Sequence, residues 1–351
     1  MFNFKKLPGA AIAAIVLILL IEGGAWLSLQ TVRRIDGNGD LIRLDSDFFN
    51  RNLRKYDTDP PMDKEVPERG SWKECWANAP YDVMVVGDST GITGWAEILR
   101  ADCGINILNL AFSVNRGLVR SANLLLGNYE GRYKHIKTVL LEVGLVRGHY
   151  EDMPGIGELI RESKERDFPR LPAMSNTEKI IEYISNKISY LRKPSVEIVD
   201  IQGRAELFLA DNINALAKPV HYPAEEYSKL CERLQYVKDS AAKKGCVYAV
   251  VAFPTKPQQY EWLLIKSGRL KTVSERTDLK MLKEACRVCH IPFLDVEEKL
   301  APIAERVFRD TGKLLWRRCD THMNETGARY SAAIINTFLS EIKSGKLPPS
   351  S

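Results

Sequence analysis

Residues 81–90 read Tyr-Asp-Val-Met-Val-Val-Gly-Asp-Ser-Thr, an apolar run followed at once by a glycine, an acid and two hydroxyl side chains. Because the side chains from Val83 to Val86 are β-branched or long and apolar, the run predicts a buried strand that stops at Gly87. Ligands of open parallel sheets bind beyond the carboxyl ends of the strands. We therefore expect Ser89, two residues past the glycine, to lie where chemistry is carried out.

Strand-like and helix-like segments alternate from this point to the C-terminus. The pattern predicts further strands at 106–110, 138–143, 246–253 and 292–295, with helices at 95–100, 121–128, 224–244, 274–289 and 325–343. Strands separated by whole helices favour a parallel sheet that is covered on both faces. The sequence therefore predicts an α/β fold, a three-layer α/β/α sandwich with a central parallel sheet.

Two other segments break this alternation. Residues 31–79 are polar and rich in turn-forming residues, which predicts a tether with an irregular lead-in. Residues 150–222 contain several prolines and no convincing central strand. They are interpreted as an insertion or cap over the active face, with ordinary crossover structure as the alternative. The main domain is then expected at 80–343.

The N-terminal segment is long and apolar. Two lysines precede the span 7–29, which is interrupted only by Glu22, glycines and a proline. At ~1.5 Å per helical residue this span can cross a ~30 Å hydrocarbon core. We expect residues 1–30 to form a signal-anchor helix with a single pass through the inner (cytoplasmic) membrane. The main domain would then lie outside the cytoplasm, in the periplasm or beyond; a hydrophobic core helix is the alternative.

The composition points to no specialised partner. Hydrophobic residues make up 45% and charged residues 27% of the chain, and acids and bases are interspersed despite a net charge of +5. Without a basic run that carries interleaved aromatics, nucleic-acid binding is not expected. Histidines and carboxylates are too scattered for metal-ligand spacing, so no metal and no cofactor are expected.

The cysteines raise a separate question. There are seven, an odd number, so at least one is unpaired within the chain. Cys286 and Cys289 form a Cys-x-x-Cys pair, which is typical of a redox pair or half a metal site. No second such pair exists in the sequence, and the spacing fits one helix face. We therefore favour buried, chemically silent cysteines.

Ser89 needs a base, because a free hydroxyl is a weak nucleophile at neutral pH. An imidazole can take its proton, and a carboxylate can orient that imidazole and stabilise its charged form. Of the five histidines, His322 alone combines a nearby acid, Asp320, with a preceding strand-like run and a following helix start that Asn324 can cap. Asp320 and His322 are the candidate partners of Ser89, although Asp-x-His pairs also arise by chance.

Two motifs together resemble a protein family. Gly-Asp-Ser at 87–89 after a strand, and Asp-Thr-His at 320–322 near the C-terminus, are similar to motifs of the SGNH (GDSL-type) hydrolases. The closer resemblance is to their membrane-associated relatives related to alginate O-acetyltransferases. Residues 320–328 are similar to the terminal motif of that group, and the strand ending in Pro-x-Lys at 248–256 resembles it as well. The resemblance covers roughly residues 80–340.

This resemblance implies a flavodoxin-like SGNH fold and three catalytic roles. Ser89 would be the nucleophile, His322 the base and Asp320 the group that orients His322. It implies a membrane-anchored serine O-acyltransferase or carbohydrate esterase that acts on O-acyl groups, in particular O-acetyl groups, of an envelope or extracellular polysaccharide. Hydrolysis and transfer share an acyl-Ser89 intermediate and differ in whether water is excluded. The implied partners are a glycan or acyl-ester substrate and a membrane protein that donates acyl groups.

The middle motifs of the family are altered. Val114 stands where the second block carries a glycine, and Val146 where the third block carries the asparagine that donates to the oxyanion. Loss of one such donor lowers turnover by ~10²–10³-fold in a hydrolase. Candidate replacements are the Ser89 backbone amide, Ser113, Asn115 and Arg147, although Arg147 fits a surface or ion-paired role equally well.

These departures support a second hypothesis, in which the protein is not an enzyme. A catalytically inactive SGNH-like protein would bind glycan or scaffold a polysaccharide export or modification complex. The missing asparagine favours that reading, while the retained Ser, Asp and His oppose it. A chance occurrence of the motifs in an unrelated anchored α/β protein is the third hypothesis.

Overall fold

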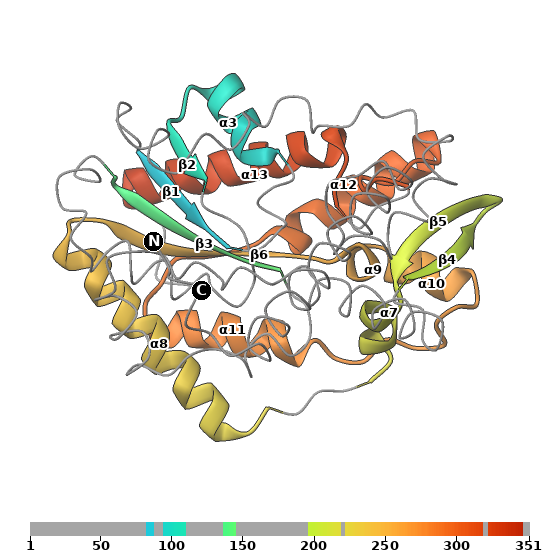
Figure 1. Cartoon of the computed structure of the whole chain (residues 1–351), viewed down its shortest axis with the longest axis horizontal. Coiled ribbons are helices and arrows are strands. Elements are labelled where there is room, and N and C mark those ends of the chain that lie inside the picture. Colours follow the sequence, from blue (N-terminus) through green and yellow to red (C-terminus); the bar gives the residue numbers. More distant parts are fainter. Residues whose placement is uncertain are drawn as a thin grey trace, which may run out of the picture. The chain divides into compact units, whose positions relative to one another are not determined.

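The structure, a computed structural model, describes residues 82–87, 94–109, 136–144, 196–218, 222–318 and 322–346 (Figure 1). All of these residues except Val196 belong to one compact unit of the chain. The expected membrane anchor at 1–30 and the tether at 31–79 lie outside the described residues. From Asp82 onward, no helix in the described part of the chain is long and apolar enough to cross a bilayer.

A parallel sheet forms the centre of the described unit. Its strands are hydrogen-bonded in the order β2-β1-β3-β6-β7, and every pairing between neighbours is parallel. The α/β class and the parallel sheet expected from the sequence are therefore confirmed. The strands are β1 (Val83–Val86), β2 (Ile107–Asn109), β3 (Thr138–Gly144), β6 (Val247–Phe253) and β7 (Phe293–Asp295).

Helices cover both faces of this sheet, as Figure 1 shows above and below the strands. Alternate residues of a strand point to opposite faces, so Val83 and Val85 join one buried cluster while Met84 and Val86 join another. A strand buried on both faces has no polar side, which explains the unbroken apolar run of β1. The first cluster includes α3 (Trp95–Cys103), α12 (Val296–Thr311) and α13 (Glu325–Ser344), and the second includes α8 (Ala224–Lys243) and α11 (Thr277–Val288).

Most predicted elements match the observed ones to within a few residues. The strands expected at 106–110, 138–143, 246–253 and 292–295 correspond to β2, β3, β6 and β7, and four of the expected helices correspond to α3, α8, α11 and α13. The helix expected at 121–128 lies outside the described residues. Hydrophobic patterning thus located the layers, because each flanking helix contributes its apolar residues to one of two continuous cores, and strands β1, β3 and β6 contribute to both.

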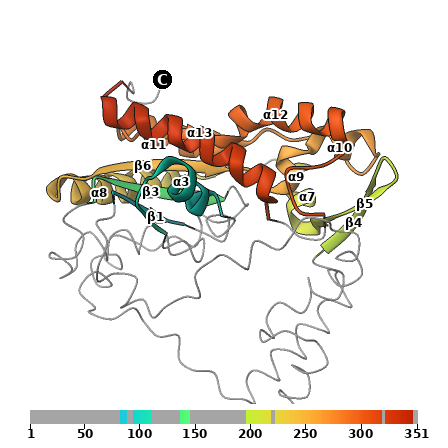
Figure 2. The ribbon, with the colours of Figure 1, turned by 90° about the horizontal axis from the view of Figure 1, so that it is seen from above.

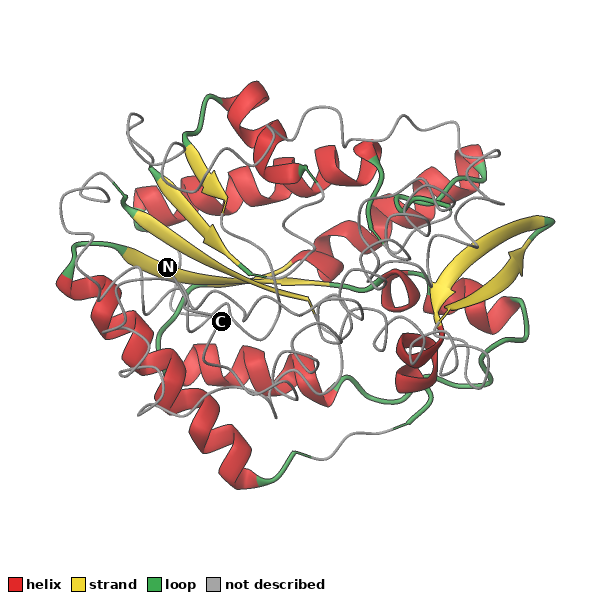
Figure 3. Ribbon diagram, in the orientation of Figure 1, coloured by secondary structure: helices red, strands yellow, loops and turns green. Residues whose placement is uncertain are grey.

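A separate pair of strands was missed. Sequence reasoning assigned no strand within 150–222, whereas β4 (Val196–Ile201) and β5 (Arg204–Leu209) form a two-stranded sheet of their own (Figure 3). The connecting residues Gln202 and Gly203 both have positive φ angles, as a tight hairpin turn requires, and the Gly203 N–H donates to Asp200 Oδ1 at 2.6 Å. Gln-Gly is not the usual Asn-Gly hairpin signal, so the sequence pattern did not predict this turn. We call this β4–β5 pair the arm.

The arm leads into short helices next to the sheet. Figure 2 shows it beside α7 and α10 and apart from the central strands. Helix α7 packs against α9, which follows the carboxyl end of β6 directly. The arm therefore belongs to the neighbourhood of that end of the sheet. The short helices are α7 (Ala210–Leu216), α9 (Lys256–Gln259) and α10 (Glu261–Lys266).

Candidate active site

The order of the strands identifies where a ligand would bind. The chain passes from β1 to β2 on one side of β1, and then crosses to β3 on the other side. In open α/β sheets the crevice beyond the carboxyl ends of the strands, at this reversal, is the usual binding site. Strand β1 ends at Val86, and the buried Gly87 follows it. Ser89 comes two residues later in the sequence.

Most of the predicted site residues lie outside the described residues. These are Ser89, Asp320 and the three candidate oxyanion donors, Ser113, Asn115 and Arg147. His322 is described and is half-buried. The structure therefore defines the surroundings of His322 and the residues on both sides of the Ser89 segment.

The residues that flank Ser89 and His322 share one core. Trp95, which starts α3 after the Ser89 segment, is fully buried and stacks on Phe253 at the carboxyl end of β6, with ring centroids 5.9 Å apart. Trp316 and Met323, on either side of the Asp320–His322 motif, belong to the same buried cluster. Both motifs are thus flanked by residues of one buried core.

Backbone hydrogen bonding joins the two ends of the segment that carries Asp320 and His322. Trp316 and Met323 pair in an isolated antiparallel bridge, and the Arg317 N–H donates to the His322 carbonyl oxygen at 2.9 Å. We call residues 316–323 the histidine turn. Its two ends are joined, so a displacement of Arg317 would be transmitted directly to His322.

Helix α13 begins directly after this turn and is anchored to the segment before it. Asn324 Oδ1 accepts from the Gly327 N–H at 2.9 Å, which confirms the predicted cap, and Asn324 Nδ2 donates to the Leu314 carbonyl at 2.8 Å. A β-carbon at Gly327 would lie 2.2 Å from the Leu315 carbonyl oxygen. Glycine is therefore required here by close packing of the helix against residues 314–316.

A buried lysine holds the other side of the histidine turn. Lys256 is the first residue of α9 and 1% exposed; the cap of that helix is held by Gln258, whose side chain accepts from the Thr255 N–H at 2.6 Å. Lys256 Nζ lies 3.0 Å from Glu206 Oε2 and 2.8 Å from the Arg317 carbonyl oxygen. A weaker contact of 3.5 Å reaches the Arg318 carbonyl oxygen.

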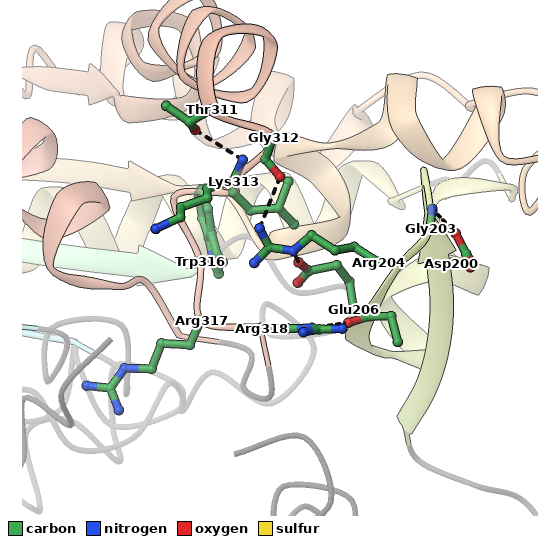
Figure 4. Close-up of polar contacts among 12 residues, drawn as sticks. Asp200, Gly203, Arg204, Glu206, Thr311, Gly312, Lys313, Trp316, Arg317 and Arg318 are labelled. Carbon is green, nitrogen blue, oxygen red and sulfur yellow. Dashed lines mark hydrogen bonds and ion pairs between the residues drawn. The ribbon is translucent and has the colours of Figure 1, made fainter. Parts of the chain in front are cut away.

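Strand β5 of the arm runs along the same segment, as Figure 4 shows. The Leu207 N–H donates to the Arg318 carbonyl at 2.9 Å, and Arg318 Nε donates to the Ala205 carbonyl at 2.7 Å. Arg204 lies 3.5 Å from Glu206 and donates to the Gly312 carbonyl at 3.3 Å. The arm therefore supports the approach to the histidine turn rather than only covering a face of the domain.

Tyr260 adds contacts at the start of the turn. Its hydroxyl accepts from the Leu315 N–H at 2.7 Å, and its ring meets the Trp316 ring edge-on with centroids 5.6 Å apart. Burial raises the pKa of Tyr260 far above its ordinary value, so the hydroxyl is neutral. Sequence reasoning had not assigned roles to Tyr260, Glu206 or Lys256; the Pro-x-Lys motif was the available signal for the lysine.

The Cys-x-x-Cys pair lies on the opposite face of the sheet. Cys286 and Cys289 are buried against α8, and both thiols are free. Burial raises the pKa of Cys289 to about 11 and that of Cys286 further. The expectation of buried cysteines is confirmed for this pair, and a redox role gains no support because reactive thiols have lowered pKa values.

The described site thus holds the segment that carries His322 by contacts from α9, the arm and α13. A search against protein-family models finds no model that matches the chain, and a search of curated proteins finds no match either.

Proposed function

We propose that the protein is an SGNH-like serine acyltransferase or esterase with a flavodoxin-like domain. The observation that carries the proposal is the convergence of two anchored segments on one core. The Gly-Asp-Ser motif follows strand β1 at the reversal of strand order, and His322 of the Asp-x-His motif lies near the end of the histidine turn, which contacts Lys256, the arm and Asn324.

In the proposed reaction Ser89 Oγ attacks the ester carbonyl while His322 takes the hydroxyl proton. Asp320 orients the imidazole and stabilises its charged form. The tetrahedral adduct collapses, the alcohol leaves with the proton from His322, and an acyl-Ser89 ester remains. Water or a sugar hydroxyl then attacks that ester, with His322 again as base, and releases Ser89. The Ser89 amide, Ser113, Asn115 or Arg147 would bind the oxyanion.

The substrate and location follow from the resemblance and are part of the proposal. The acyl group would be transferred to or removed from a glycan of the cell envelope. Residues 7–29 would anchor the domain in the inner membrane, with the catalytic part outside the cytoplasm, and a membrane protein would supply acyl groups in the transferase case.

Covalent labelling tests the proposal. The full chain, solubilised in mild detergent, is treated with a fluorophosphonate, which reacts only with activated serines. We expect one label on Ser89, absent in Ser89→Ala and at least ~100-fold slower in His322→Ala, since the base is lost. Ser340→Ala, which changes an exposed serine on α13, is the matched control. Equal labelling of all four proteins at background would sink the enzyme proposal.

The inactive-scaffold alternative makes the opposite prediction. Val146 at the position of the oxyanion asparagine favours it. In that case Ser89 stays unlabelled, acetyl esters such as 4-nitrophenyl acetate are not turned over above background, and the chain still binds an acetylated glycan with an affinity that Ser89→Ala leaves unchanged.

A further inference from the structure

A fully buried ion pair lies beside the histidine turn. The side chains of Lys256 and Glu206 are 0% and 2% exposed, and their charged atoms are 3.0 Å apart. Burying two charges is unfavourable unless each finds partners. The pair joins α9 to the arm, two elements that are far apart in the sequence, at the point where Lys256 contacts Arg317 and Arg318 and the arm contacts Arg318.

The lysine does more than neutralise the glutamate. Its ammonium donates to the Arg317 carbonyl at 2.8 Å, while the N–H of the same Arg317 donates to the His322 carbonyl at 2.9 Å. One residue, Arg317, is therefore held by Lys256 on one side and holds His322 on the other. An apolar side chain at 256 would leave the Arg317 carbonyl without this donor.

The glutamate fixes the lysine in turn. Glu206 lies on β5 between Ala205 and Leu207, and both of these neighbours are hydrogen-bonded to Arg318. Lys256 also lies 4.9 Å from the centre of the Phe208 ring, a further contact with the same strand. The ammonium is thus confined between β5 and the start of the histidine turn.

We propose that Lys256 and Glu206 are positioning residues that set the place of His322 for the reaction described above. The inference rests on the proposed function for its catalytic readout. Neither side chain is exposed to substrate; both act through Arg317 and Arg318. Because misplacement of a reacting group by about 1 Å lowers a rate by ~10²-fold, loss of the lysine is expected to slow the acylation of Ser89 by ~10–100-fold.

Three variants of the full chain separate positioning from bulk stability. Lys256→Met removes the charge at similar length, Glu206→Leu removes its partner, and the double variant replaces the ion pair by an apolar pair. Lys238→Met is the matched control, because Lys238 also donates to a carbonyl, that of Cys289, on the other face of the sheet.

Stability is measured as the unfolding midpoint of each variant. Activity is measured as kcat and KM for an acetyl ester and as the rate of fluorophosphonate labelling. Local opening is measured as hydrogen exchange of peptides covering 313–324. We expect the double variant to recover stability relative to the single variants. Its kcat and labelling rate stay ~10–100-fold down with KM within about twofold, because the Arg317 carbonyl still lacks its donor. Exchange at 313–324 becomes faster in Lys256→Met and not in Lys238→Met.

The outcomes are distinct. Recovery of kcat together with stability in the double variant would overturn the positioning role, and so would unchanged exchange at 313–324 in Lys256→Met. A third outcome is that the wild type is inactive but the 313–324 peptides exchange faster in Lys256→Met than in the wild type. That result would refute the proposed enzyme function and support the placement of the histidine turn by Lys256.

Discussion

Replacement of Gly327 by alanine probes the packing on which the histidine turn depends. The added β-carbon would lie 2.2 Å from the Leu315 carbonyl oxygen, so helix and segment must separate by about 0.8 Å to reach the shortest separation that real β-carbons show. The same carbonyl accepts from the Asn324 N–H at 3.0 Å. The added β-carbon therefore overpacks the site, and the separation that would relieve the overpacking weakens a backbone hydrogen bond.

The magnitude follows from three terms. Overpacking of a buried site costs ~1–3 kcal/mol, and a weakened hydrogen bond up to about 1 kcal/mol. The lower chain entropy of alanine in the unfolded state offsets ~0.5–1 kcal/mol. We expect Gly327→Ala to lower the free energy of unfolding by about 1–3 kcal/mol, opposite in sign to an ordinary glycine-to-alanine change in a helix.

The assay is urea unfolding of the full chain in its purification buffer, followed by tryptophan fluorescence. A lower midpoint at unchanged slope reports the loss of stability. The control is Ala333→Gly, at an exposed position of the same helix, which should cost ~0.5–1 kcal/mol from backbone entropy alone. If Gly327→Ala matched or exceeded the wild-type stability, the close approach of α13 to Leu315 would be wrong.

Two further predictions concern the helix cap and the buried thiols. Asn324→Ala should cost ~1–2 kcal/mol because it removes the α13 cap and the bond to Leu314, whereas Asn324→Ser keeps a neutral cap acceptor and should cost less; equal losses in urea unfolding would refute the cap assignment. The pKa of Cys289 is raised to about 11, so only about one part in a thousand of this thiol is expected to be thiolate at pH 8. The rate of its maleimide labelling should therefore keep rising as the pH is increased above 8. Of the cysteines that the structure describes, the exposed Cys103 should react first, and site-resolved mass spectrometry that found Cys289 or Cys286 reacting as fast would contradict the buried arrangement.

Part of residues 150–222 contributes to the surroundings of the histidine turn. An insertion or cap over the active face, with ordinary crossover structure as the alternative, is the expectation from proline content and the missing strand pattern, and most of that range lies outside the described residues. Within the described residues 196–218, the observed role is support: β5 is hydrogen-bonded to Arg318, and Glu206 reaches the buried Lys256. If substitutions in β5 alter kcat, the effect is expected to arise through the histidine turn.

Local pattern alone was enough to identify the strands of the central sheet, four of the flanking helices and the cap at Asn324, whereas helix α12, which also covers the sheet, was not predicted. Each of these depends on residues that are close in sequence: an apolar run such as Val83 to Val86, helical spacing of apolar residues, or a side chain that bonds the helix it precedes. The candidate nucleophile and base also came from short motifs, and whether Ser89, Asp320 and His322 meet remains a prediction for the labelling experiment.

Tertiary structure alone decided what holds the histidine turn. Lys256, Glu206 and Tyr260 are separated from residues 315–318 by at least 50 positions, and each acts through polar contacts made only when β5, α9 and the turn come together. Such contacts leave no periodic trace in the sequence, because one lysine or one glutamate satisfies them and its neighbours are free to vary. The sheet can be predicted from patterns that repeat along the chain. The contacts that support His322 become visible only when the folded chain brings distant residues together.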